Sequence, residues 1–234
     1  FEYFMLPGTD TFTRQQVGLL TRLSPLSPLE RTSARESYPL KSSGCGALST
    51  NHSSGISKHY MARLRLDLPG KSGATLAVLG LHLKAFPTSP KACHQREAQA
   101  AVAASLLAQA LDETDYVVAL GDINDFDGDE CCLDAKNSTP TSRVLRMLKN
   151  PRSVDQDELH SVAERIPHAE RYTSWWDHKP KDGVDQGLEE HSSIDHILVS
   201  SSLFRHLASA RVDHSAAPAD VSDHWPMVAN FDFS

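Results

Sequence analysis

The stretch Tyr116-Val117-Val118-Ala119-Leu120-Gly121-Asp122-Ile123-Asn124 decides the fold. Its first five residues form an apolar run of the kind found in strands that are covered on both faces. Gly121 permits a sharp turn after the strand, and the alternation of an extended chain then points Asp122 and Asn124 to the same side. A carboxylate and an amide oxygen suit a hard cation such as Mg²⁺, but an Asx turn that closes the strand explains these residues equally well.

Similar patterns on both sides of this stretch predict further strands and two helices. The expected strands cover Val17–Leu23, Tyr60–Leu68, Thr75–Leu83, Ile194–Val199 and Pro226–Phe233, with Arg171–Trp176 and Leu207–Val212 as weaker candidates. Apolar residues at helical spacing predict a helix over Lys91–Leu111, and a shorter helix is expected over Thr141–Leu148. Strands interleaved with helices in this order indicate an α/β domain built in layers.

We expect a single domain over residues 1–234, because no linker divides the chain. Residues 24–55 are rich in Ser and Pro and are expected to form a loop insertion, and the polar stretch 177–192 is expected to form a second loop. The sequence begins with Phe1 rather than Met and starts within an aromatic run, so we expect a fragment or a processed form.

The composition argues against several classes of protein. Lys and Arg number 23 and Asp and Glu 30, and the net charge of −7 argues against a broad basic surface for nucleic acid, although not against a nuclease with few contacts. No run of about 18 apolar residues occurs, so no membrane span is expected. The 4 cysteines lack the spacing of structural zinc sites, and no Glu completes the calcium-loop pattern that begins at Asp122.

Four short segments each bring His, Asp or Asn to an apolar strand. They are Leu79–Lys84, Val117–Asp125, Ser193–Leu198 and Val221–Pro226. Charged and imidazole groups beside buried strands cost free energy unless they are paired or bind a metal. Four such segments in one chain favour one shared site over four unrelated burials.

Two of these segments contain an Asp-His pair, Asp195-His196 and Asp223-His224. Neighbours on an extended chain point to opposite faces, so only one member of each pair should enter a given site. The simplest arrangement uses His224 as a catalytic imidazole, Asp195 as the carboxylate that orients it, and Asp223 near a metal. A hydrogen-bonded turn explains a single such pair without any function, and His82 alone is explained by a core histidine bonded to the backbone.

Taken in order along the chain, four motifs resemble the endonuclease/exonuclease/phosphatase superfamily, which includes DNase I, apurinic endonucleases and neutral sphingomyelinases. The motifs are His82-Leu83-Lys84, Gly121-Asp122-Ile123-Asn124-Asp125, Ile194-Asp195-His196 and Ser222-Asp223-His224-Trp225-Pro226. The resemblance runs from about Val17 to the C-terminus. It implies an α/β fold that is a four-layer sandwich, with two packed, mostly antiparallel sheets flanked by helices. It also implies hydrolysis of a phosphoester, with Mg²⁺, or alternatively Mn²⁺, as cofactor.

The resemblance also implies a role for each motif residue. Asp122 corresponds to the carboxylate that orients or deprotonates the attacking water, and Asn124 to its partner at the phosphate and the metal. Asp223 corresponds to a further metal-site carboxylate, so the implied metal ligands are Asp122, Asn124 and Asp223. His224, oriented by Asp195, corresponds to the imidazole that binds the scissile phosphate or acts as acid or base.

His82 resembles the second imidazole that is found in the DNase I and sphingomyelinase branches. The chemistry requires a metal that neutralises developing charge, an activated water and a proton donor for the leaving oxygen. One feature departs from the superfamily: the Asn and the metal-binding Glu expected on two upstream strands are not found. We therefore expect the N-terminal strands to be missing.

These features predict a metal-dependent phosphoesterase, a nuclease or phosphodiesterase that acts on nucleic acid, a phospholipid headgroup or an inositol phosphate. The alternative is a non-catalytic binding module that retains the fold, and the missing Glu supports it. The chain is expected to be a monomer. The pair Trp175-Trp176 could mark a hydrophobic tip for a lipid, but a strand with one Trp buried and the other at its edge is the favoured interpretation.

Overall fold

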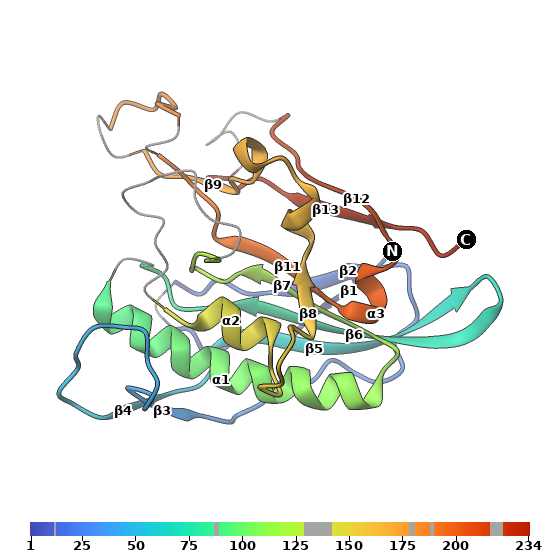
Figure 1. Cartoon of the computed structure of the whole chain (residues 1–234), viewed down its shortest axis with the longest axis horizontal. Coiled ribbons are helices and arrows are strands. Elements are labelled where there is room, and N and C mark those ends of the chain that lie inside the picture. The colour runs from blue at the N-terminus through green and yellow to red at the C-terminus, as the bar shows by residue number, and fades with distance from the viewer. Residues whose placement is uncertain (12, 87–88, 129–141, 178–180, 188–189, 216–221) are drawn as a thin grey trace.

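The computed structural model describes residues 1–11, 13–86, 89–128, 142–177, 181–187, 190–215 and 222–234 (Figure 1). Its strands are β1 (Glu2–Met5), β2 (Gly18–Thr21), β3 (Glu36–Tyr38), β4 (His52–Ser54), β5 (Lys58–Leu68), β6 (Lys71–His82), β7 (Tyr116–Asp122), β8 (Leu159–Ser161), β9 (Ser174–Trp175), β10 (His191–Ser192), β11 (Asp195–Ser200), β12 (Leu207–Val212) and β13 (Met227–Phe231). Its helices are α1 (Pro90–Glu113), α2 (Val144–Lys149) and α3 (Ser201–Phe204), with short 3₁₀ turns at η1 (Val162–Arg165) and η2 (His168–Glu170).

Five of the described strands form a central sheet in the order β5-β6-β7-β11-β8. β6 and β7 are parallel, because α1 carries the chain back along the sheet between them, and the other neighbours in this sheet are antiparallel. The remaining strands pair as β1–β2, β3–β4, β9–β10 and β12–β13. The fold is therefore a strand-rich α/β fold with a mixed, mostly antiparallel central sheet.

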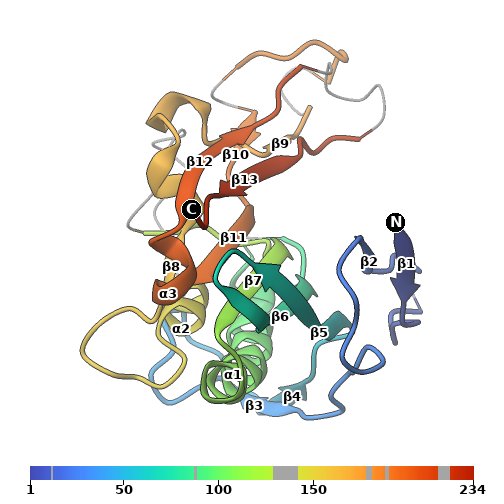
Figure 2. The same cartoon turned by 90° about the vertical axis from the view of Figure 1, so that its right-hand side faces the viewer.

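Helix α1 covers one face of the central sheet (Figure 1, Figure 2). Ser89 caps its first turn by accepting the Ala92 N–H, and Pro90 occupies the first helical position, where a missing N–H is tolerated. Apolar side chains of α1, such as Leu107, pack with those of β6, β7 and α2, such as Leu148, in the largest core cluster. This core supports the strands that carry the site described below.

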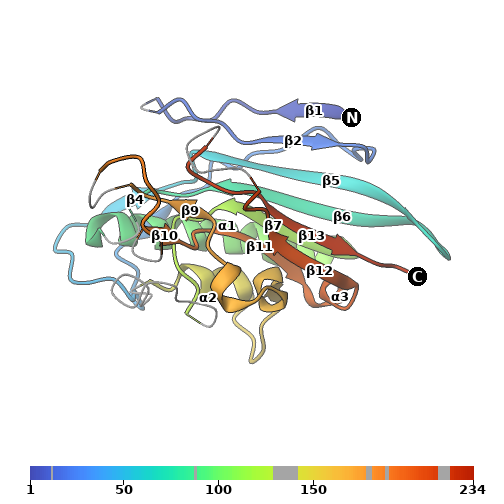
Figure 3. The same cartoon turned by 90° about the horizontal axis from the view of Figure 1, so that it is seen from above.

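The opposite face of the sheet is covered in two parts. On β5, Tyr60 and Leu64 pack with apolar residues of the N-terminal segment, such as Leu19. Farther along the sheet, Tyr116 and Leu207 belong to a second cluster that includes residues of β12 and β13. In Figure 3, β1 and β2 lie beside β5, whereas β12 and β13 lie toward β7 and β11.

The first half of β5 is buried on both faces, which the alternation of its sequence did not predict. Tyr60 is packed under the N-terminal segment, while Met61 belongs to the core on the α1 side. Only from Arg63 onward do polar residues of β5 become partly or fully exposed at alternate positions. The reason is tertiary packing. Polar residues of β5 become exposed where the N-terminal segment and the α1 side of the core no longer cover the strand.

Residues 24–55 form more strand pairing than the expected loop insertion implies. β3 and β4 pair with one another, and Glu30 forms an antiparallel bridge to Met61 of β5. A disulfide joins Cys45 to Cys93 of α1. Most of the segment is nevertheless irregular, and its treatment as an insertion into a single domain stays a prediction.

The expected strands and both expected helices are present, and their described ends differ from the expected ones by at most four residues. The short elements β1, β3, β4, β8, β10 and α3 were not predicted, because two to four residues carry too little periodicity. None of the described helices has the length and hydrophobicity that crossing a membrane requires.

Candidate active site

Four neighbouring strands of the central sheet place charged or imidazole side chains in one row. In the strand register, Lys58 of β5 lies opposite His82 of β6. His82 lies opposite Asp122 of β7, and Asp122 lies opposite Asp195 of β11. We call these four residues the polar row. It crosses the edge of the sheet at which β6 and β7 both end, because parallel strands finish on the same side.

Side-chain contacts run along the polar row and continue beyond it. His82 Nε2 lies 3.4 Å from Asp122 Oδ2 and 3.5 Å from Lys58 Nζ. His224, from the segment before β13, extends the row because its Nδ1 lies 2.7 Å from Asp195 Oδ2. The structure thus brings together four predicted site residues, His82, Asp122, Asp195 and His224, from four distant segments.

The segment that carries His224 is fixed by pairing with β9. The Trp225 N–H donates to the Thr173 carbonyl at 2.8 Å, and Ser174 and His224 form an antiparallel bridge. The Thr173 hydroxyl oxygen is buried and accepts the Asp195 N–H at 3.0 Å. Thr173 therefore links the two segments that supply the His224–Asp195 pair, and no motif or periodicity in the sequence indicates this role.

The turn after β7 is set by two residues with positive φ. Gly121 has φ 131°, and a Cβ at this position would lie 2.0 Å from the Leu81 carbonyl oxygen, so only glycine fits. Asn124 has φ 54°; its N–H donates to Asp122 Oδ1 at 2.9 Å and its Nδ2 to the Leu83 carbonyl at 3.4 Å. The Asx turn is therefore present, and it leaves Asp122 Oδ2 directed to the polar row.

Burial and neighbouring charges set the protonation of the site. Burial, and then the charge of Asp195, raise the pKa of Asp122 to about 7. Burial, and then the Lys58 ammonium, lower the pKa of His82 to about 4, so its contact with Asp122 at neutral pH is not an ion pair. The hydrogen bond to Asp195 raises the pKa of His224 to about 9. At neutral pH, His82 is therefore uncharged, and His224 is charged and can donate a proton.

Lys58 connects the polar row to the N-terminal segment. Its side chain is 9% exposed, its Nζ lies 3.3 Å from Asp10 Oδ2, and it donates to Gln15 Oε1 at 3.0 Å. The sequence pattern indicates no role for Lys58, because this residue precedes the expected start of its strand. Only the register of β5 against β6 places it next to His82.

Two buried side chains of α1 hold the loops that follow β6 and β7. Arg96 is fully buried, and its Nε donates to Asp125 Oδ2 at 2.8 Å while its Nη1 donates to the Phe86 carbonyl at 3.0 Å. Gln99 Oε1 accepts the Lys84 N–H at 2.9 Å. Both loops leave the sheet at the edge that carries the polar row. The contacts with α1 therefore hold these two loops in place beside the site.

The acidic stretch after β7 is held in ion pairs, which argues against a calcium loop. Asp125 is paired with Arg96, and Asp127 Oδ2 lies 2.7 Å from Lys149 Nζ with both side chains buried. Asp129, which belongs to the same stretch, lies outside the described residues.

The two Asp-His pairs divide between opposite faces. Asp195 faces His224, whereas His196 is buried and its Nε2 lies 2.8 Å from a backbone carbonyl oxygen of the loop after β7. In the second pair His224 joins the row, whereas Asp223 is exposed and accepts the Trp175 N–H through its backbone carbonyl. Within the described part of the chain, no hydrogen bond or ion pair joins the Asp223 carboxylate to the row.

No protein-family model matches the chain, and no curated protein matches its sequence. Solved structures do match. The 3′ phosphatase NExo from Neisseria, bound to a product DNA hairpin, is 20% identical, with a TM-score of 0.56 over 74% of this chain and 64% of that chain. The APE2 catalytic domain from Xenopus laevis is 17% identical, with a TM-score of 0.57 over 75% of this chain and 55% of that chain. The human Nocturnin catalytic domain with bound sulfate is 17% identical, with a TM-score of 0.51 over 100% of this chain and 72% of that chain.

The chain has the DNase I-like fold of the endonuclease/exonuclease/phosphatase superfamily. The resemblance drawn from the four motifs is thereby confirmed at the level of the fold. Identities of 17–20% establish no more than the fold. The chain spans 64% of the length of NExo and 55% of that of the APE2 catalytic domain.

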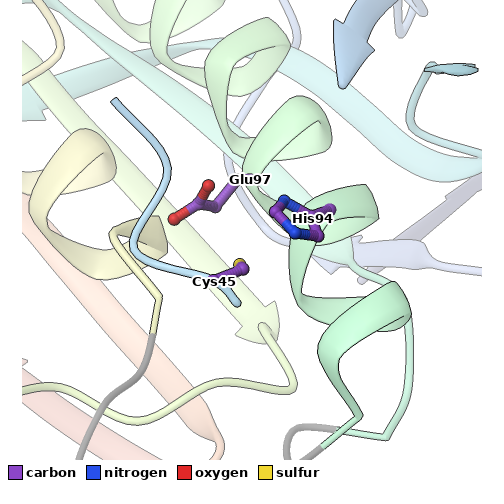
Figure 4. Close-up of side chains that lie close together, drawn as sticks. All are labelled: Cys45, His94 and Glu97. Carbon is purple, nitrogen blue, oxygen red and sulfur yellow. The ribbon is translucent and has the colours of Figure 1, made fainter. Parts of the chain in front are cut away.

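The donor chemistry at this edge of the DNase I-like fold suits a hard cation. Asp122 and Asp195 set two carboxylates side by side. The Asn124 amide nitrogen donates a hydrogen bond to the Leu83 carbonyl, which leaves the Asn124 amide oxygen as the atom that can ligate a metal. The row does not form a compact three-ligand group, however. Among the described residues, the one group in which three His, Cys, Asp or Glu ligand atoms lie within 4.8 Å of one another is elsewhere, at α1 (Figure 4).

The two tryptophans of the segment at β9 lie in different environments. Trp175 is buried, and its Nε1 donates to Glu190 Oε2 at 2.8 Å, whereas Trp176 is 66% exposed. The favoured interpretation, with one Trp buried and its neighbour at the edge, is confirmed.

Proposed function

We propose that this chain hydrolyses a phosphoester bond with the help of a bound divalent cation. One observation carries the proposal: the polar row and His224 gather two carboxylates and two imidazoles at one edge of the sheet. Isolated turns do not account for contacts between four distant segments, whereas a shared catalytic site requires them. NExo is described as a 3′ phosphatase and as a 3′-5′ exonuclease, and both activities are compatible with this chemistry.

Asp122, Asn124 and Asp223 are the residues that would hold the cation. Their carboxylate and amide oxygens are donors that Mg²⁺ and Mn²⁺ accept, and a cation would offset the repulsion between Asp122 and Asp195. When bound, the cation would neutralise the charge that develops on the phosphate.

The chain's own residues orient the water and move the proton. Asp122, held by the N–H of Asn124, orients the attacking water and accepts its proton. His224, held in place by Asp195, binds the scissile phosphate or donates a proton to the leaving oxygen. His82 is the second imidazole, and its uncharged ring binds the phosphate or takes up a proton on the other side of Asp122.

The substrate is a phosphoester of nucleic acid, of a phospholipid headgroup or of an inositol phosphate. The exposed ring of Trp176 lies two residues from Ser174, which pairs with His224, so it is placed to stack on a base or to enter a lipid surface. We further propose that the chain acts as a monomer and as one domain that lacks the N-terminal strands of the fold, and that its sheets belong to a four-layer sandwich.

The proposal is tested with bis(p-nitrophenyl) phosphate and plasmid DNA in Mg²⁺ or Mn²⁺, followed by headgroup and inositol phosphate substrates. Both the chain and a version extended by any coding sequence before Phe1 are assayed. Asp122→Ala and His224→Ala should each lower kcat by about 10²–10⁴-fold. Asp67→Ala, an exposed carboxylate on β5, is the matched control and should leave kcat unchanged.

Activity that resists EDTA, undiminished activity of both site variants, or no activity in either version would contradict the proposal. The last result would favour the alternative, a non-catalytic binding module with the same fold. Calorimetric titration with Mg²⁺ separates the two, because a binding module should show no metal binding that depends on Asp122.

A further inference from the structure

We propose that this chain has a redox-controlled zinc site formed by Cys45, His94 and Glu97. The reduced protein binds Zn²⁺, or a similar borderline cation, at this position, and the disulfide between Cys45 and Cys93 excludes the metal. The site uses no residue of the polar row, and it does not depend on the proposed phosphoesterase activity.

The three side chains are already close. Cys45 Sγ, a ring nitrogen of His94 and a carboxylate oxygen of Glu97 all lie within 4.8 Å of one another. Figure 4 shows His94 and Glu97 on α1 and Cys45 on the segment beside it. His94 and Glu97 are buried, whereas Cys45 is partly exposed, so a reductant and a metal can reach the sulfur. Thiolate, imidazole and carboxylate are the three ligand types that zinc accepts from proteins.

The ring of His94 is oriented as a metal ligand would be. Its Nε2 contacts the Gly46 carbonyl, which can only accept, so Nε2 carries the hydrogen. Nδ1 of the neutral ring is then the acceptor, and it lies 3.1 Å from the Ser43 hydroxyl oxygen. Metal-binding imidazoles have this arrangement, with one N–H fixed by a carbonyl and the other nitrogen free to coordinate. The Ser43 hydroxyl therefore takes the place of a cation in the oxidised form.

Glu97 supplies an independent indication that a ligand is missing. Its Oε1 accepts the N–H groups of Gly44 and Arg143, both at 2.9 Å. Its Oε2 is buried and has no hydrogen-bond partner among the described residues. A buried acceptor without a partner costs about 1–3 kcal/mol. A cation bound beside Cys45 and His94 would satisfy this oxygen.

The switch requires a dithiol reductant. The reductant transfers two electrons and two protons to the Cys45–Cys93 bond, which becomes two thiols, and it is itself oxidised to a disulfide. The Cys45 thiol then loses one proton as its sulfur binds Zn²⁺, and water fills the fourth position. In the oxidised form the Cys45 sulfur is bonded to Cys93 and cannot act as a thiolate, so metal and disulfide exclude one another.

The test uses the full chain with Cys131→Ser and Cys132→Ser, titrated with Co²⁺ in excess Mg²⁺ and followed by the thiolate-to-cobalt charge-transfer absorption. The reduced protein should bind one Co²⁺, which Zn²⁺ displaces, and the oxidised protein should bind none. Cys93→Ser and Cys45→Ser both remove the disulfide and form a matched pair. Cys93→Ser should bind Co²⁺ without reductant, and Cys45→Ser should not.

Glu97→Gln adds a graded readout. It should keep the charge-transfer band but weaken Co²⁺ binding at least about tenfold, because the loss of a partner outside the ligand set already has an effect of that size. Equal binding by Cys45→Ser and Cys93→Ser would overturn the proposal. So would a reduced, normally folded protein without the band, and this measurement does not depend on whether either variant folds.

Discussion

The two ends of the central sheet differ in how far their charged residues are exposed to water. At the site end, Lys58 and Asp122 lie in the polar row, and the Lys58 side chain is only 9% exposed. At the other end, where β5 turns into β6, Lys71 pairs with Asp115 at 2.6 Å and its side chain is 52% exposed. Strands β5, β6 and β7 run between both ends, so strand pairing does not explain the difference.

What differs is the cost of each arrangement. An exposed ion pair gains little because water screens it, and it loses little when it is broken. A buried charged group loses its hydration and must be held by several partners, as Lys58 is held by Asp10, Gln15 and His82. Charged residues at the site end therefore lower the stability of the fold, and their presence there is best explained by function.

The largest expected effect is on catalysis. Asp195→Asn should lower kcat by at least about 100-fold, because His224 loses the carboxylate that orients it and stabilises its charge. Asp115→Asn is the matched change at the other end, where the carboxylate also contacts a cationic partner. If steady-state kinetics show equal losses in both variants, the distinction between the two ends fails.

The next effect concerns the buried ion pair beside the site. Arg96→Met should lower the free energy of unfolding by about 3–5 kcal/mol, because it leaves the buried Asp125 carboxylate without its partner. Lys71→Met should cause no measurable change. Urea unfolding followed by circular dichroism measures both, and comparable losses for the two variants would contradict the comparison.

Two glycines at the opposite ends sharpen the comparison further. Gly121→Ala should destabilise the protein by about 3 kcal/mol or more, because its Cβ would meet the Leu81 carbonyl and its φ is 131°. Gly70→Ala, with φ 72° and open space around the new Cβ, should cost about 1 kcal/mol. Thermal unfolding of the two variants should give these losses in this order.

A smaller, pH-dependent effect is expected from His59, next to Lys58. Burial, and then Arg31, lower its pKa from 6.5 to about 4. The unfolded chain therefore takes up this proton at a higher pH than the folded protein does. The contribution of His59 to stability is complete above pH 6.5 and is lost as the pH falls toward 4, with a total of about 3 kcal/mol.

His59→Gln should make stability less dependent on pH over this window. The measurement is the urea midpoint of the wild type and the variant at several values between pH 7 and pH 4. His52→Gln, whose ring is exposed, is the control and should follow the wild type. Parallel curves for His59→Gln and the wild type would show that the proton uptake lies elsewhere.

Much of the candidate site, at the end of the sheet that carries the polar row, could be predicted from the sequence. The apolar runs of β6 and β7 end in polar residues and that of β11 begins with one, and this pattern indicated His82, Asp122 and Asp195. Gly121 was identified as a glycine that the backbone requires, although β7 continues through it to Asp122 and the close Leu81 carbonyl adds a second reason. Side-chain alternation also separated His224 from its neighbour in the pair.

Other parts of the site depend on contacts that local pattern does not encode. Lys58 and Thr173 matter because of strand register and pairing with a distant segment, and neither leaves a trace in periodicity. The Asp223 carboxylate is exposed and forms no described hydrogen bond or ion pair with the row, so its role as a metal ligand stays a prediction. Likewise, the partner of Cys45 could not be read from spacing, because spacing alone does not determine which cysteines pair.

Arg96 and Gln99 lie three positions apart on α1, so they reach the two loops from one side of the helix. Adding or deleting one residue between Gln99 and Val102, which packs in the core, would turn both side chains by about 100° around the helix axis relative to the core-packing face. Both loops would lose their anchors together. Natural variation in the length of this helix should therefore be confined to its ends, with the stretch from Arg96 to Val102 held to a fixed number of residues.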